Sequence, residues 1–399
     1  MNKISAHTNW AAVGFLFCLG MVASAQIFKL APALPYLRSE LNLSLVAGGL
    51  LFSIINMTPA LIGVGAGSLA DHVGFRRSLL FGLLGLAISG LFGSLSHTVE
   101  FILLFRFFEG VSILAVVITA PAMISSITAP HQRHIALSLW SSYMPMGAAL
   151  TLLMAPYLLD QMGWRTLWQI SAGIAFLMAG IMYFFLHTPK IATHSKTVSG
   201  LFRRLGDVLS KPVPWLLTMP FLFFTALQGP ILAWLPSFLM EQRGLSAMMA
   251  GVLTAGIILS NVGGVMMGGI LLARGIPHWR LICISGILIF FGSIGLFNEH
   301  LPDIIRYGCC ILTIGLTGML PTAALSSVPQ FAPTENHVGT LNGMLIQGSQ
   351  TGHFVGPPLY ALIVHRAGGD WGSALGLYLV FALLIFFCGL LLRRYATSE

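Results

Sequence analysis

Two ionisable residues of opposite charge lie within one long apolar stretch of the sequence. Arg106 and Glu109 are three residues apart in the run 99–122, so in a helix they share one face. Burial away from water favours the protonated carboxyl group, whereas a neighbouring guanidinium favours the carboxylate. One interpretation is an ion pair that neutralises both charges. The other is a proton-coupling site, in which Glu109 gains and loses a proton as its pairing with Arg106 changes.

A third charged residue, Lys29, follows Gln26 in another apolar run. A lysine near the end of a membrane-spanning helix can extend its amine to the membrane surface, and that interpretation stays open. If Lys29 instead faces an internal cavity, it favours a substrate that carries a carboxylate or another anionic group. We predict Lys29 and Gln26 as cavity residues.

Uncharged polar side chains and one histidine are further candidates for a cavity lining. Asn342, Gln350 and His353 project to a similar side of one predicted helix, and its glycines at 348, 352 and 356 have a spacing that suits close helix packing. A histidine at this place is a packing residue, a proton site or, as we predict, a ligand contact. The other predicted cavity residues are Asn56, Gln228 and Asn261.

The sequence shows no arrangement typical of an enzyme. A nucleophile–base pair is not evident, and neither are a Cys/His spacing for metal ligands and a glycine-rich motif for nucleotide phosphates. The 18 methionines form no recurrent Met-x-x-x-Met pattern, so we expect them to be packing residues. We expect a protein that is not an enzyme and that uses no cofactor and no metal.

The composition indicates which kind of elements position these residues. The chain has 399 residues, of which 56% are hydrophobic and 8% are charged. Soluble domains contain about 25% charged residues, so a soluble enzyme, a nucleic-acid binder and a disordered scaffold are excluded as main interpretations. The basic residues are spread between apolar runs and form no patch for nucleic acid. We predict an all-α integral membrane protein whose surroundings are the lipid bilayer.

Apolar runs long enough to cross a bilayer occur twelve times. A spanning helix needs ~20 apolar residues. The predicted transmembrane helices are 10–34, 45–70, 78–96, 99–122, 134–158, 166–187, 213–240, 246–273, 279–298, 303–328, 338–365 and 371–392.

The placement of Lys and Arg predicts the orientation of these spans. With a cytoplasmic N-terminus, the inner segments carry thirteen Lys and Arg residues and the outer segments carry five. Both termini are therefore predicted to be cytoplasmic, in a bacterial inner membrane. The first span contains Ala23-Ser24-Ala25, which is similar to a signal-peptide cleavage site, but we expect the segment to be retained as a span.

The chain also contains a weak internal repeat. A shift of about 201 residues aligns Leu34 with Leu235, Pro35 with Pro236, Gly67 with Gly268, Gly74 with Gly275, Pro156 with Pro357 and Arg165 with Arg366. Two halves of the same orientation are typical of transporters that bind substrate at the membrane midplane between them. We predict two six-helix bundles, 1–187 and 213–399, joined by a cytoplasmic linker at 188–212.

The short loop at residues 67–77 carries the strongest local motif, GSLADHVGFRR. This motif resembles the G-x-L-a-D-r-x-G-r-r signature of the major facilitator superfamily, whose loop forms a charge-assisted latch that favours one access state. The resemblance assigns a gating role to Gly67, Asp71, Gly74, Arg76 and Arg77.

Two further motifs extend the resemblance to the whole chain. The sequence RFFEG at 106–110 is similar to the family pattern R-x-x-q-G, and GWR at 163–165 is similar to the start of the sixth span in this family. The fifth span matches the drug–proton antiporter pattern g-x-x-x-G-P-x-x-G-G only at Pro156.

The resemblance implies a secondary active transporter of the major facilitator type. Such a protein moves a small organic solute by alternating access, driven by the proton gradient, and is expected to be a monomer. The alternative within transport is broad-specificity drug or metabolite efflux by proton antiport. The poorly matched fifth span counts against that alternative, and the apolar cavity lining favours it.

Overall fold

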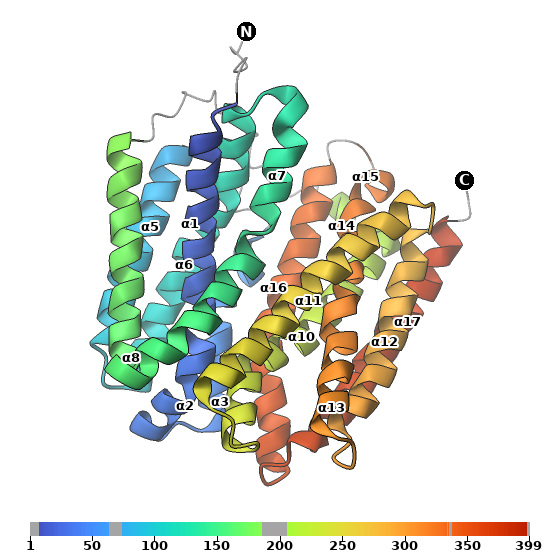
Figure 1. The fold of residues 1–399 in the computed structure, drawn as a ribbon. Coiled ribbons are helices and arrows are strands. Elements are labelled where there is room, and N and C mark those ends of the chain that lie inside the picture. The colour runs from blue at the N-terminus through green and yellow to red at the C-terminus, as the bar shows by residue number, and fades with distance from the viewer. Residues whose placement is uncertain (1–7, 64–73, 186–205, 333, 335–336, 397–399) are drawn as a thin grey trace. The chain divides into compact units, whose positions relative to one another are not determined.

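The described part of the chain consists of helices joined by turns. The computed structural model describes residues 8–63, 74–185, 206–332, 334 and 337–396, and these residues form no strand (Figure 1). The predicted all-helical fold class is therefore confirmed.

The helices before residue 186 are α1 (Trp10–Phe28), α2 (Leu30–Leu41), α3 (Leu45–Ser53), α5 (Phe75–Ser94), α6 (Val99–Ile127), α7 (Arg133–Ser141) and α8 (Tyr143–Phe185). Those after residue 205 are α10 (Pro212–Glu241), α11 (Ala247–Ala273), α12 (His278–Phe297), α13 (Asp303–Cys310), α14 (Met319–Ser326), α15 (Val328–Phe331), α16 (Val338–Arg366) and α17 (Leu375–Ala396).

Ten helical stretches among the described residues are long and apolar enough to cross a membrane, so the chain is a multi-pass membrane protein. One of them, Pro130–Phe184, has 55 residues and contains a break at Gly163, whose φ of 76° and ψ of 171° are not helical. Without a Cβ, glycine adopts this conformation at little steric cost. Helix α16 has 29 residues and is not among the ten; it carries the polar side chains predicted to line a cavity.

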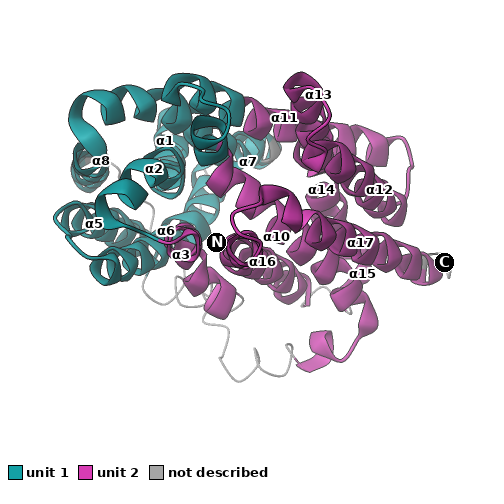
Figure 2. Ribbon diagram, turned by 90° about the horizontal axis from the view of Figure 1, so that it is seen from below, with its two compact units in different colours: residues 1–43, 65–196, 236–255 teal, residues 44–64, 197–235, 256–399 magenta. Residues whose placement is uncertain are grey.

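The contacts within the chain divide it into two compact units (Figure 2). Unit 1 contains residues 1–43, 65–196 and 236–255, and unit 2 contains residues 44–64, 197–235 and 256–399. Helices α1, α5, α6 and α8 therefore belong to unit 1, and α3, α12, α16 and α17 belong to unit 2. The predicted boundary at 188–212 lies mostly outside the described residues and stays a prediction.

Close helix packing organises the core of unit 1. A Cβ on Gly82 of α5 would lie 2.7 Å from Cγ2 of Val116 and 2.8 Å from the carbonyl oxygen of Ser112, both in α6. Glycine thus allows the two backbones to approach. Leucines of α1 and α5, including Leu16 and Leu83, are fully buried in the same core. This core holds α6, and with it Arg106 and Glu109, against α1.

In unit 2, the predicted glycine face of α16 packs against α10. Cβ atoms on Gly348, Gly352 and Gly356 would meet Thr218, Leu222, Thr225 and Ala226 of α10. The close packing predicted from the four-residue spacing is confirmed.

This packing predicts a position-specific stability effect. A Cβ on Gly356 would lie 2.8 Å from Cα of Ala226, whereas a Cβ on Gly339 of the same helix meets nothing within 4 Å. We expect Gly356→Ala to lower the thermal midpoint of the purified protein, because overpacking destabilises a core by about 1–3 kcal/mol. Gly339→Ala is the matched control and should keep or raise the midpoint, since alanine favours the helix by about 0.5–1 kcal/mol. Equal midpoints for the two variants would contradict the contact.

Candidate functional site

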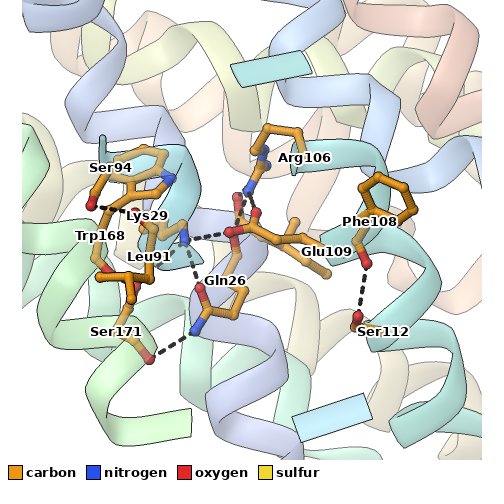
Figure 3. A network of polar contacts seen from close by, with 11 residues as sticks. Gln26, Lys29, Leu91, Ser94, Arg106, Phe108, Glu109, Ser112, Trp168 and Ser171 are labelled. Carbon is orange, nitrogen blue, oxygen red and sulfur yellow. Dashed lines mark hydrogen bonds and ion pairs between the residues drawn. The ribbon is translucent and has the colours of Figure 1, made fainter. Parts of the chain in front are cut away.

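Three charged side chains form a buried cluster in unit 1 (Figure 3). Oε1 of Glu109 lies 2.7 Å from Nζ of Lys29, and Oε2 of Glu109 lies 2.7 Å from Nη1 of Arg106. Each of the three residues is 1% exposed. One carboxylate therefore bridges two cations, and each of its oxygens accepts a charge-assisted hydrogen bond.

The end of α1 provides additional acceptors for Arg106. Its guanidinium donates from Nη1 to the carbonyl oxygen of Gln26 at 2.6 Å and from Nη2 to that of Ile27 at 3.4 Å. The α-helix is interrupted at Lys29, and Pro32 supplies a reason, because proline cannot donate to the carbonyl group of Phe28. Carbonyl groups at a helix C-terminus carry partial negative charge, which stabilises a guanidinium there.

Lys29 is held on its other sides by α1 and α8. Its Nζ donates to Oε1 of Gln26 at 2.6 Å and, at a longer 3.4 Å, to Oγ of Ser171. Nζ also lies 4.6 Å from the centre of the Trp168 ring, a cation–π distance. The amine is thus buried within unit 1 and does not extend to the protein surface.

The three charges of this cluster do not cancel. Lys29 and Arg106 contribute two positive charges, and Glu109 contributes one negative charge, so the three side chains together carry +1 when all are ionised. A buried net charge is unfavourable unless it is compensated. This arrangement can attract an anion.

A cavity of about 320 Å³ lies beside Lys29, wholly in unit 1. Its lining comes from three stretches of chain, 18–29 of α1 and 147–158 and 167–178 on the two arms of α8, before and after the break at Gly163. Each stretch rises about 16 Å at 1.5 Å per residue, so the cavity is a trough along the helices. Gln26, Lys29 and Ser171 line one end, where their polar atoms bond one another and Glu109, and the surface of the cavity is almost entirely apolar.

Sequence reasoning missed several of these partners. Neither Ser171 nor Trp168 was among the candidates. Trp164, Trp168 and Ser171 are spaced by four and three residues, a helical-face pattern that offers a signal for them. Another missed residue is Glu40, which pairs with Arg165 and accepts a hydrogen bond from Nε1 of Trp164 at 2.6 Å.

The other predicted cavity residues lie in unit 2. His353 of α16 packs against α10: a Cβ on Gly229 of α10 would lie 3.3 Å from Nδ1 of His353. Gln228 directly precedes Gly229 in α10. Asn261 of α11 donates at 2.6 Å to the carbonyl oxygen of Ile314, which belongs to a π-helical turn. The remaining three are Asn56, which is buried, and Asn342 and Gln350 of α16, which are half-buried.

The predicted gating loop is only partly described. Gly67 and Asp71 lie outside the described residues. Gly74 precedes α5 with a φ of 87°, a conformation that favours glycine. Arg76 donates to the carbonyl oxygen of Tyr183 near the end of α8 at 2.7 Å, and Arg77 is exposed.

Known proteins similar to this chain are membrane transporters. The hexuronate transporter of Bacillus subtilis is 22% identical over 388 residues, which cover 90% of this chain and 89% of that protein. The cis,cis-muconate transport protein of Acinetobacter baylyi is 27% identical over 284 residues, 66% of this chain and 68% of that protein. The structure of a bacterial homologue of the human lysosomal transporter Spinster superposes with a TM-score of 0.81 at 16% identity, covering 97% of each chain.

The family assignment follows from a match that spans most of the sequence. Residues 16–345 match the family model described as Major Facilitator Superfamily. The resemblance carried by the 67–77 loop is thereby confirmed, and the chain is a transporter and not an enzyme. This chain belongs to the major facilitator superfamily.

Proposed function

We propose that this chain is a secondary active transporter that moves a small organic anion across the membrane together with protons. The observation that carries the proposal is the buried cluster of Lys29, Arg106 and Glu109, with its charge of +1. Lys29 is a buried cation whose one anionic partner in the cluster is Glu109, and a substrate carboxylate can take the place of that partner. The names of two similar proteins, which refer to hexuronate and muconate, support an organic acid as substrate.

Proton coupling follows from the charge balance of this cluster. When Glu109 takes up a proton, it no longer neutralises Lys29, and the three side chains then carry +2. A bound carboxylate restores the charge to +1. Binding of the proton and binding of the anion therefore favour each other, which is the linkage that symport needs.

The membrane arrangement is part of the same proposal. A break at Gly163 divides the 55-residue stretch into two helices, and α16 adds a further one, so ten stretches become twelve spans. We propose two six-helix halves, 1–187 and 213–399, that alternate access to the substrate, as a monomer in a bacterial inner membrane with both termini cytoplasmic.

Further roles are proposed for residues outside the charged cluster. The loop residues Gly67, Asp71, Gly74, Arg76 and Arg77 act as a gate between access states. In unit 2, the polar residues that contribute to substrate binding are Asn56, Gln228, Asn261, Asn342, Gln350 and His353.

The test is uptake into proteoliposomes that contain the purified protein. Radiolabelled glucuronate, cis,cis-muconate and decanoate are offered outside, with and without an inward proton gradient. We expect at least one acid to accumulate above its outside concentration when the proton gradient is present. When an ionophore removes the gradient, the same acid should reach equal concentrations inside and outside. The proposal is wrong if no acid enters faster than into protein-free liposomes.

Export of apolar compounds by proton antiport is the second candidate. The largely apolar lining of the trough in unit 1 favours it. Inside-out vesicles separate the two functions: antiport predicts that an apolar compound accumulates in vesicles whose interior is acidic, and that organic acids do not.

A further inference from the structure

The trough in unit 1 has the form of a site for an elongated amphipathic molecule. It follows α1 and both arms of α8 for about 16 Å, and its volume is about 320 Å³. The lining of its apolar part includes Met21, Val22, Leu150, Met154, Ile174 and Met178. A polyhydroxylated acid would lose hydrogen bonds to water there without replacing them.

The single charged end of the trough determines the charge of its occupant. Lys29 lies at that end, and its third N–H has only the 3.4 Å contact with Ser171, the longest of its hydrogen bonds. A carboxylate placed there would accept a shorter, charge-assisted hydrogen bond and would compensate the +1 of the cluster. The other polar lining residue, Thr151, already donates to the carbonyl oxygen of Gly147 at 2.8 Å.

We infer that the trough binds an unbranched aliphatic monocarboxylate of medium length, with its carboxylate at Lys29 and its chain directed toward Cys18. This inference rests on the proposed transport of organic anions and names the class of anion. Exposed apolar side chains of α8 that line the trough, Leu150, Met154, Ile170 and Ile174, give a hydrocarbon chain an apolar route to the site.

Cys18 provides a direct readout of occupancy because it lines the trough and is exposed. The full-length protein in lipid nanodiscs is treated with N-ethylmaleimide, and the labelling of Cys18 is followed by peptide mass spectrometry. We expect decanoate to slow this labelling at least fivefold. Decanol, which has a similar chain and no charge, and glucuronate, which has the charge and no apolar chain, should leave the rate unchanged.

A pair of matched variants tests the position of the chain. Ala25 lines the trough between Cys18 and Lys29, and Ala25→Phe fills it there; Ala11→Phe makes the same change at an exposed position of α1 outside the trough. We expect Ala25→Phe to weaken binding of radiolabelled decanoate at least tenfold, measured by scintillation proximity, and Ala11→Phe to bind as the wild type does.

Three results would overturn the inference. They are equal protection of Cys18 by decanol and decanoate, unchanged decanoate binding by Ala25→Phe, and a co-purified phospholipid that Ala25→Phe releases and decanoate does not displace. If glucuronate or muconate is accumulated while decanoate does not bind, the proposed function stands and this inference fails. If no acid is accumulated and none binds, both fail.

Discussion

Glu109→Gln is expected to abolish proton-driven accumulation while leaving exchange of the transported acid across the membrane. Glutamine retains the shape of the protonated carboxyl group but cannot release a proton, so Lys29 stays available to the substrate in every state. Binding of the acid should then no longer depend on pH. Proteoliposomes measure both properties: uptake driven by a proton gradient, and exchange of internal unlabelled acid for external labelled acid at equal pH.

The same substitution should lower stability, because it removes the only carboxylate of the cluster from between two buried cations. Removing one partner of a buried ion pair destabilises proteins by about 3–5 kcal/mol. Glu100→Gln is the matched control, since Glu100 is exposed in the first turn of the same helix. Accumulation by Glu109→Gln at the wild-type level would remove Glu109 from proton coupling.

A charge-balanced double variant separates the loss of stability from the loss of coupling. Lys29→Met combined with Glu109→Gln leaves Arg106 as the one charge of the three, so their sum is +1 again. We expect its thermal midpoint to lie above that of Glu109→Gln alone, although it should not accumulate substrate. The two substitutions contact each other in the native structure, so their effects on stability should not be additive.

The parts of the fold that depend on local periodicity were accessible from the sequence. Arg106 and Glu109 share a helix face because they are three residues apart, and the structure pairs them at 2.7 Å. The glycine spacing in α16 likewise predicted close packing, which the contacts with α10 confirm. Both patterns are properties of a single helix, so they need no knowledge of how helices pack.

The parts that depend on packing between distant segments were not accessible. Lys29 meets Glu109 across 80 residues of sequence, and a lone lysine in an apolar run fits a membrane surface as well as a buried ion pair. The trough is even harder to predict from the sequence, because its lining combines α1 with both arms of α8. The break at Gly163 falls in the gap between the predicted spans 134–158 and 166–187, so its place was accessible from the sequence, but the direction in which it sends the two parts of α8 was not.

Lys29→Met is expected to weaken binding of the transported acid strongly while preserving the fold. Methionine is long and apolar, and Glu109 keeps its 2.7 Å ion pair with Arg106, so the remaining cluster is neutral. We therefore expect a thermal midpoint close to that of the wild type. A charge-assisted hydrogen bond contributes about 1.5–3 kcal/mol, so binding of the acid should weaken roughly tenfold to hundredfold.

Comparing Lys29→Met with Glu109→Gln separates substrate binding from proton coupling. Both variants lose accumulation, but Lys29→Met should also lose exchange, because the acid binds far more weakly, whereas Glu109→Gln should keep it. Lys211→Met is the matched control, since Lys211 is exposed before α10. If Lys29→Met binds the acid with wild-type affinity, the charge that attracts the substrate lies elsewhere, and Lys29 serves only to pair with Glu109. If it loses its fold instead, the amine is needed to hold α1, α6 and α8 together through Gln26, Glu109 and Ser171.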